Sequence, residues 1–149
     1  MKFPTFLLST CLFLSSSVFA GTPASLQVID PWVREAPPGM QVMGAFLKLK
    51  NTSDQAVMLI GSHSDSFAKV EIHKTEITAG KARMLRQKQI EILPGEEKVF
   101  EPGSFHLMMM KPEKTLNEGA MVNITLEFES GEQVDFIAPV KKGMTHMMH

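Results

Sequence analysis

The chain has 149 residues, of which 44% are hydrophobic, 21% charged and 7% aromatic, and its formal net charge is −1. This length fits one globular domain with a core of its own. The near-neutral charge excludes the basic surface of nucleic-acid-binding proteins, and one tryptophan without any tyrosine argues against a platform for stacking bases. Two counts are unusual, because there are 12 methionines but only one cysteine.

Residues 1–20 have the pattern of a secretory signal peptide. Lys2 precedes an apolar stretch over 6–14, and Val18 and Ala20 are the small residues that flank a cleavage site. The apolar stretch is too short for a permanent transmembrane helix, and we expect no membrane span. We predict cleavage after Ala20 and localisation in the periplasm. A lipid anchor on Cys11 is the weaker alternative, because Cys11 follows too short an apolar region and Thr10 is a poor neighbour for it.

The rest of the chain alternates between strand-length segments and turn signals. No stretch has a convincing helical period, and Pro–Gly and similar breaks separate the segments. We predict strands over Ser25–Asp30, Val42–Lys50, Gln55–Ile60, Ala68–His73, Gln89–Leu93, Lys98–Phe100, Phe105–Met110, Met121–Phe128 and Gln133–Val140. The pattern indicates an all-β antiparallel sandwich or barrel, a single domain over residues 21–140 with a flexible tail over 141–149.

Histidine and methionine occur together within these strands. Strand periodicity places His106 and Met108 on one face, with Met110 on the same face. His73 ends a strand in which Val70 and Ile72 have the core parity, so His73 points away from the core. Imidazole and thioether donors without thiolate or carboxylate suit Cu(I), whereas zinc and calcium prefer other ligands.

Met84 lies just past the turn at Gly80 and completes a spacing of His73, ten residues, Met84, twenty-one residues, His106, one residue, Met108. This spacing is similar to the signature of the periplasmic copper chaperones called PCu(A)C. The segments around Asp30–Arg34, Pro37–Gly39, Leu93–Gly95 and Gly103–Met108 resemble that family in the same order, so the resemblance covers residues 25–140.

The resemblance implies a cupredoxin-like Greek-key β-sandwich that binds one Cu(I) through His73, Met84, His106 and Met108. It also implies delivery of copper to the CuA centre of cytochrome c oxidase, beside Sco-type thiol–disulfide proteins. The chain departs from many members at Thr75, where a second methionine or histidine is common. The tail carries Met144, His146, Met147 and His149, and family resemblance suggests a second site there, with Cu(II) bound by the two histidines; a tail without a site is the alternative.

Other residues of the same types have simpler explanations. We expect Met43, Met58 and Met121 to fill the core, and His63 to lie at the surface. Trp32 is expected to anchor packing, and Arg34 and Arg86 to lie on a solvated face. Whether Met40 or Met110 contacts the metal is left open.

The sequence does not suggest an enzyme. No Ser–His–Asp arrangement is indicated, and no cysteine remains after cleavage at residue 20. A copper-storage or resistance protein without a dedicated acceptor is the main alternative to a chaperone. A copper redox enzyme is disfavoured, because two histidines and two methionines stabilise Cu(I) too strongly for cycling.

Overall fold

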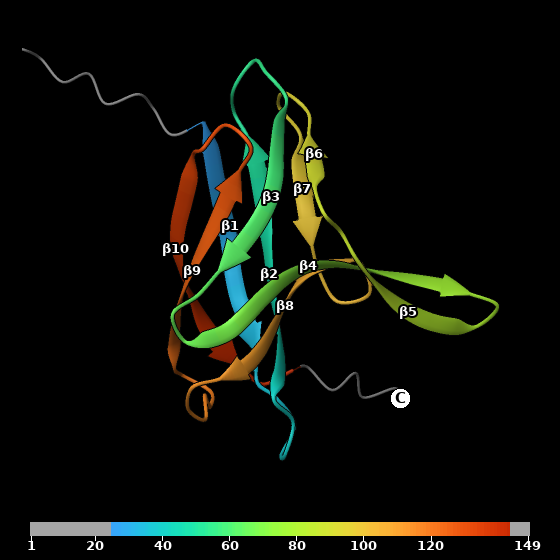
Figure 1. Cartoon of the computed structure of the whole chain (residues 1–149), viewed down its shortest axis with the longest axis vertical. Helices are drawn as coiled ribbons and strands as arrows, with labels where there is room; N and C mark the ends of the chain where they lie inside the picture. Colours follow the sequence, from blue (N-terminus) through green and yellow to red (C-terminus); the bar gives the residue numbers. More distant parts are fainter. Residues whose placement is uncertain (1–24, 144–149) are drawn as a thin grey trace, which may run out of the picture.

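The computed structural model describes residues 25–143, and within that range the chain forms ten β-strands and no helix (Figure 1). The predicted all-β class is confirmed. The strands are β1 (Leu26–Arg34), β2 (Val42–Asn51), β3 (Val57–His63), β4 (Phe67–Thr78), β5 (Lys81–Arg86), β6 (Ile90–Ile92), β7 (Glu97–Phe100), β8 (Phe105–Pro112), β9 (Met121–Phe128) and β10 (Gln133–Lys141).

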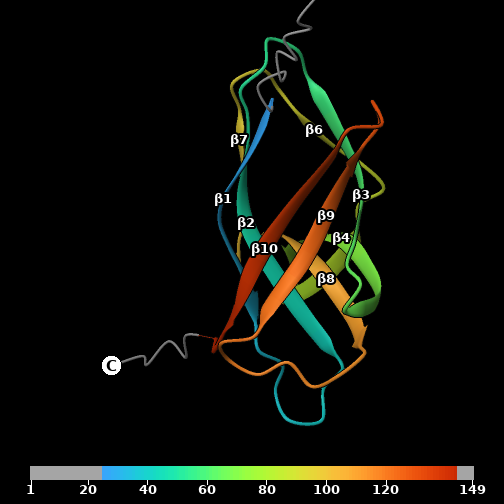
Figure 2. The ribbon, with the colours of Figure 1, turned by 90° about the vertical axis from the view of Figure 1, so that its left-hand side faces the viewer.

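Two groups of strands enclose the core. One group contains β1, β2, β4, β5, β7 and β8, and the other contains β3, β6, β9 and β10. The parallel pairing of β1 with β10 joins them into one continuous strand order, β5-β4-β8-β7-β2-β1-β10-β9-β3-β6. Figure 2 shows β9 and β10 in front of β2 and β8. The result is the cupredoxin-like sandwich that was predicted.

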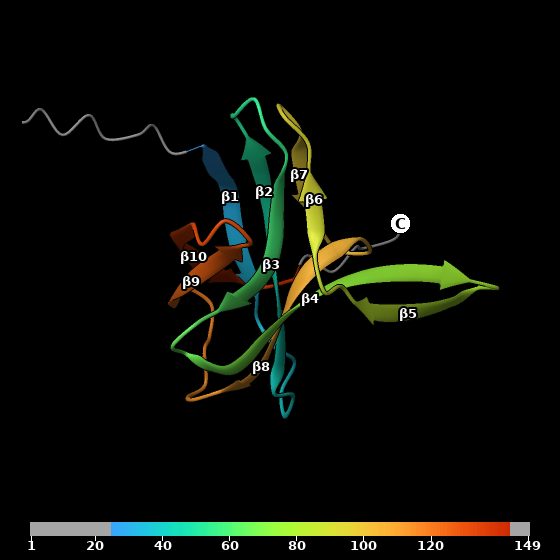
Figure 3. The same cartoon turned by 45° about the horizontal axis from the view of Figure 1, so that its top comes forward.

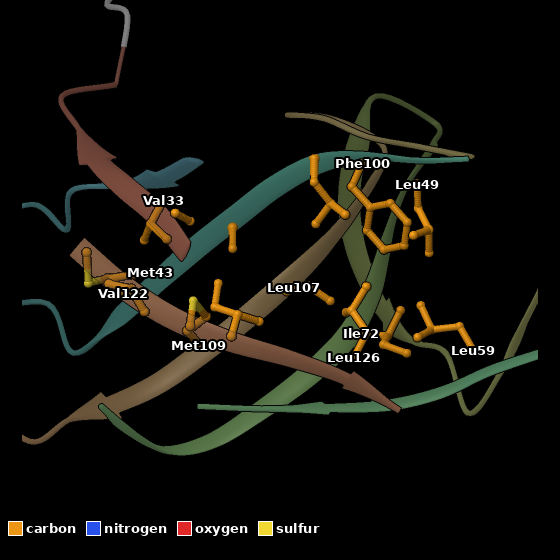
Figure 4. Packing of buried hydrophobic residues seen from close by; sticks show 14 of the residues in the cluster. Val33, Met43, Leu49, Leu59, Ile72, Phe100, Leu107, Met109, Val122 and Leu126 are labelled. Carbon is orange, nitrogen blue, oxygen red and sulfur yellow. The ribbon is translucent and has the colours of Figure 1, made fainter. Parts of the chain in front are cut away.

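Alternation of buried and exposed residues along several strands supplies much of the core, most clearly in β9. In β9 Val122, Ile124, Leu126 and Phe128 are buried, while their neighbours Met121 and Asn123 are exposed, as the predicted hairpin with β10 requires. In β4 and β8 the core residues include Ile72, Leu107 and Met109, and Figure 4 shows them among the packed apolar side chains between the two groups. The residues next to them in sequence must therefore face the other way.

The sequence did not predict the hairpin of β4 and β5. We expected a strand that ended at His73, but β4 continues to Thr78 and pairs with β5, which Figures 1 and 3 show projecting beyond the body of the sandwich. A two-residue turn connects the strands, with positive φ at both Ala79 (51°) and Gly80 (73°). These angles make a type I′ turn, whose twist matches that of the flanking strands. All six residues of β5 are exposed.

Candidate metal centre

Two histidines face each other across β4 and β8. His73 and His106 are direct partners in the antiparallel register, with ring centroids 5.8 Å apart and an angle of 42° between the rings. Both point away from the core, because their neighbours Ile72 and Leu107 are buried in it. Even so, only 8% of His73 and 6% of His106 is exposed.

Each imidazole has one anchored nitrogen. His73 Nε2 lies 2.8 Å from a carboxylate oxygen of Glu71, and His106 Nδ1 lies 3.1 Å from the backbone carbonyl of Ser104. Both partners are acceptors, so these ring nitrogens donate. The other nitrogens, His73 Nδ1 and His106 Nε2, are buried and, within the described part of the chain, have no hydrogen-bond partner. This is the state of a metal-binding histidine, with one nitrogen fixed by an outer partner and a lone pair on the other.

The two predicted methionines lie on the same face of the sheet. Met108 is opposite Glu71 on one neighbouring strand and opposite Gly44 on the other. Met84, on β5, is opposite Thr75, which shares its parity along β4 with His73. Met108 is half-buried, whereas 57% of Met84 is exposed. The register therefore gathers all four predicted ligands from three strands onto one surface.

A shallow cavity of about 190 Å³ opens on this surface. Its wall includes three of the four predicted ligands, Met84, His106 and Met108; His73 lies beside His106 and is not part of the wall. The complete lining is Arg34, Val42, Met43, Gly44, Phe46, Thr75, Met84, Pro102, Gly103, His106 and Met108.

An aromatic and cationic cluster borders the cavity. A bulge after Ile29, with Asp30 at φ 50°, carries β1 past Pro31 and sets Trp32 opposite Phe46. The two rings lie 4.7 Å apart, and the Arg34 guanidinium carbon lies 5.8 Å and 5.4 Å from their centroids. Trp32 thus packs as predicted, but Arg34 is half-buried rather than solvated.

Close packing at Gly44 belongs to the same wall. The Phe46 ring passes over this residue so closely that a Cβ there would meet the ring at 3.0 Å. A larger residue would displace the ring beside Met108 and His106. The sequence did not indicate that Gly44, Phe46 or Arg34 belongs to the wall of the site. A lone glycine or aromatic residue in a strand gives no signal for a binding site.

Burial and charge set the protonation of the site. Burial of the His106 ring, with a smaller contribution from the neighbouring His73, lowers its pKa, although the Ser104 carbonyl opposes the shift. Hydrogen bonds from Lys69 and His73, with the charge of Arg86, lower the pKa of Glu71 to about 2. Near neutral pH the site therefore has a neutral His106 imidazole, ready to donate a lone pair, beside an ionised Glu71 carboxylate.

The donor set fits a soft ion. In residues 25–143 no group of three or more His, Cys, Asp or Glu side chains has an arrangement that holds a metal. The cluster described above instead combines two imidazoles with two thioethers, which suit Cu(I). Glu71 contacts His73 and lies behind the four donors instead of being one of them. The sequence signal that could have identified Glu71 is its parity with His73 in the segment Val70–His73, which puts both side chains on one face of the strand.

Other predicted residues lie elsewhere. Met43 is buried in the core and His63 is exposed, both as predicted. His63 Nδ1 lies 2.9 Å from a carboxylate oxygen of Glu127. Met58 is half-buried, but the core assignment of Met121 is wrong, because 61% of it is exposed.

Met110 and Met40 lie in different places relative to the four predicted ligands. Met110 follows Met108 on the site face and is opposite Val42. Met40 is exposed and lines a separate, larger cavity formed with the loop at Pro37–Gly39. Met144, His146, Met147 and His149 lie outside the described residues, as do the predicted signal peptide and its cleavage site.

Solved structures with a similar fold include copper-binding PCuAC domains and their relatives, which have a cupredoxin-like sandwich. The copper-bound PCuAC domain from PmoF2 superposes with a TM-score of 0.67 at 24% identity, covering 80% of this chain and 94% of that domain. The solution structure of Cu(I)-DR1885 from Deinococcus radiodurans gives a TM-score of 0.62 at 25% identity, covering 82% of this chain and 83% of that one.

The family follows from the sequence. A family model described as putative lipoprotein LpqE-like matches residues 26–140, and the chain belongs to this LpqE-like family. A putative lipoprotein of Leifsonia xyli subsp. xyli is 30% identical over 117 residues, which is 78% of this chain and 69% of that protein. A Rickettsia prowazekii protein is also 30% identical over 117 residues, but the match spans 63% of its length. No helix in residues 25–143 has the length and apolar character needed to cross a bilayer.

Proposed function

We propose that this protein is a Cu(I)-binding metallochaperone that acts in the periplasm. The observation that carries the proposal is the pair of facing imidazoles, each with one anchored nitrogen and one buried nitrogen without a partner in the described part of the chain. Met84 and Met108 lie on the same face and supply the thioethers that select a soft ion. We assign His73, Met84, His106 and Met108 as the copper ligands.

The four donors differ in accessibility, which suits transfer of the ion. The two histidines and Met108 lie on paired strands of the sandwich, whereas Met84 lies on the exposed strand β5 at the edge of the sheet. An incoming acceptor ligand meets the Met84 side of the site first. Replacement of this thioether is therefore the natural first step of release, while the histidines hold the ion until a second acceptor ligand arrives.

Several considerations support export and delivery. The sequence of residues 1–20 has the pattern of a signal peptide, and the family and the Leifsonia relative are described as lipoproteins, a class of exported proteins. The copper-bound PCuAC domain and Cu(I)-DR1885 share the fold. We propose the CuA centre of cytochrome c oxidase as acceptor, with Sco-type proteins acting beside the chaperone, and a second copper at Met144, His146, Met147 and His149.

Competition titration with a chromophoric Cu(I) chelator tests the binding site. The protein lacking residues 1–20 is expected to bind one tight equivalent, which Met84→Ala and His106→Ala weaken sharply. Met121→Ala is the matched control, because Met121 is an exposed methionine on β9, which does not contribute to the site. Equal binding by all four proteins would contradict the assignment.

Transfer to an acceptor separates a chaperone from a storage protein. The Cu(I)-loaded protein is mixed with an apo CuA domain, and copper in each protein is measured after separation. A chaperone transfers copper faster than the ion dissociates into a chelator solution. Transfer no faster than dissociation would favour storage.

A further inference from the structure

Glu71 stands at the centre of a small charge network behind the proposed ligands. It precedes His73 by two residues on β4, so both side chains project from the same face. One carboxylate oxygen lies 2.8 Å from His73 Nε2; the other lies 2.6 Å from Lys69 Nζ and 3.5 Å from Arg86 Nε. Only 11% of the Glu71 side chain is exposed.

We propose that Glu71 is a positioning residue for copper binding, which fixes the tautomer and orientation of His73 so that Nδ1 is its metal-binding nitrogen. This inference rests on the proposed function and adds a residue to it. Glu71 acts through His73 and does not itself bind the ion.

The tautomer follows from the chemistry of the acceptor. A neutral imidazole carries one hydrogen, which either ring nitrogen can hold. A carboxylate only accepts hydrogen bonds, so the contact with Glu71 keeps the hydrogen of His73 on Nε2 and leaves the lone pair on Nδ1. His73 Nδ1 is the buried nitrogen for which the described residues supply no hydrogen-bond partner.

His106 has the opposite arrangement. The Ser104 carbonyl keeps its hydrogen on Nδ1, so the lone pair is on Nε2, which is again buried without a partner among the described residues. The two histidines therefore bind copper through different nitrogens. The tautomer of His106 is fixed by a backbone carbonyl, which no side-chain substitution removes. The tautomer of His73 is fixed by the Glu71 side chain, which can be substituted.

The cations around Glu71 hold its carboxylate in place. Lys69 lies on the same strand, and Arg86 is opposite His73 on β5. Since Met84 is also on β5, the contact between Glu71 and Arg86 ties the thioether strand to the His73 anchor. Removal of the Glu71 acceptor would therefore free the His73 ring to rotate and to change its tautomer.

Histidine tautomers can be measured without copper. Long-range ¹⁵N–¹H NMR of the apo protein distinguishes protonation at Nδ1 from protonation at Nε2. The variants are Glu71→Leu, which removes the acceptor, and Glu71→Gln, whose amide oxygen still accepts from Nε2. Glu76→Gln is the control, since Glu76 is on the same strand with opposite parity and contacts Lys74. Dispersion of the core amide signals reports that each variant is folded.

We expect a single Nε2–H tautomer for His73 and a single Nδ1–H tautomer for His106 in the wild-type protein. In Glu71→Leu, His73 is expected to populate both tautomers while His106 keeps its own, and Cu(I) affinity is expected to fall by roughly 10- to 100-fold, as for loss of other outer-shell partners. Glu71→Gln and the control are expected to keep the wild-type tautomers and affinities within about threefold.

Three results would overturn the proposal: an unchanged His73 tautomer in Glu71→Leu, an unchanged Cu(I) affinity in that folded variant, or equal losses of affinity in Glu71→Gln and Glu71→Leu. A wild-type protein that binds no Cu(I) would instead overturn the proposed function. In that case the tautomers of the apo proteins still decide whether Glu71 fixes His73.

Discussion

Adjacent methionines on β8 have opposite surroundings and give the sharpest test of how the site is built. Met109 is fully buried in the core, whereas Met108 is half-buried on the face that carries the two histidines. Replacing each by alanine changes the same atoms at positions one residue apart. We predict that Met109→Ala lowers the free energy of unfolding and leaves Cu(I) affinity nearly unchanged. Met108→Ala should instead lower Cu(I) affinity strongly and change the free energy of unfolding only a little.

The magnitudes follow from burial. Loss of a fully buried methionine side chain costs about 2–5 kcal/mol of unfolding free energy, because a cavity remains in the packed core. The Met108 side chain borders an open cavity and is partly solvated already, so its loss costs about 1 kcal/mol in the apo protein. For a domain of this size Met109→Ala should lower Tm by on the order of 10 °C.

Cu(I) affinity should fall strongly in Met108→Ala and little in Met109→Ala. Met108→Ala removes a proposed ligand, so its effect should exceed the roughly 10- to 100-fold loss that follows removal of an outer partner. Thermal unfolding of the apo proteins gives the first quantity and chelator competition the second. Similar effects of both substitutions on both quantities would refute the division of β8 into a core face and a metal face.

Three further predictions concern acidity, the tail and the cavity wall. Because the pKa of folded His106 lies below its ordinary value of 6.5, the unfolded chain takes up this proton more readily, and stability should fall as pH drops through 6.5. Urea unfolding of the apo protein at pH 7.5 and 5.5 should show this fall, and His106→Asn should reduce it. Glu71 does not account for the fall, because its contribution to stability is lost only below its ordinary pKa of 4.5. Equal falls in the wild-type protein and in His106→Asn would contradict the assignment of the effect to His106. Truncation after Gly143 should remove any second copper equivalent and retain the first, as measured by metal analysis after gel filtration; an unchanged stoichiometry would exclude a site on the tail. Thr75→Met adds a thioether opposite Met84 on the cavity wall and should raise Cu(I) affinity several-fold in the chelator competition, whereas an unchanged affinity would show that this position does not reach the ion.

Alternation made most of the sandwich predictable from the sequence. The β9–β10 hairpin was clear because Val122, Ile124 and Leu126 alternate with polar residues. The same alternation places Met121 on the solvated parity, so its expected burial went against the local pattern.

The strand β5 was not predictable in this way. None of its residues is buried, so pairing with β4 holds it in place and no apolar periodicity marks it. Its turn uses Ala79–Gly80 instead of the Asn–Gly or Asp–Gly that usually signals a type I′ hairpin. The sequence therefore indicated that Met84 follows a turn at Gly80, but it did not indicate that Met84 lies on a strand paired with β4.

The spacing of the four donors was visible in the sequence, but their orientation was not. Parity alone places His73 and His106 outside the core. Their register across β4 and β8, and the anchoring of each ring by Glu71 and Ser104, depend on how distant strands pair. Those contacts decide which nitrogen of each ring is available to a metal.

Copper K-edge X-ray absorption of the Cu(I)-loaded protein tests the central claim most directly. We predict a Cu(I) edge and a first shell of two nitrogen and two sulfur scatterers for the protein truncated after Gly143. Met84→Ala and Met108→Ala should each lose one sulfur, and Met121→Ala should lose none. A first shell without sulfur, or one that neither substitution changes, would contradict the assignment of this face of the sandwich as the copper site.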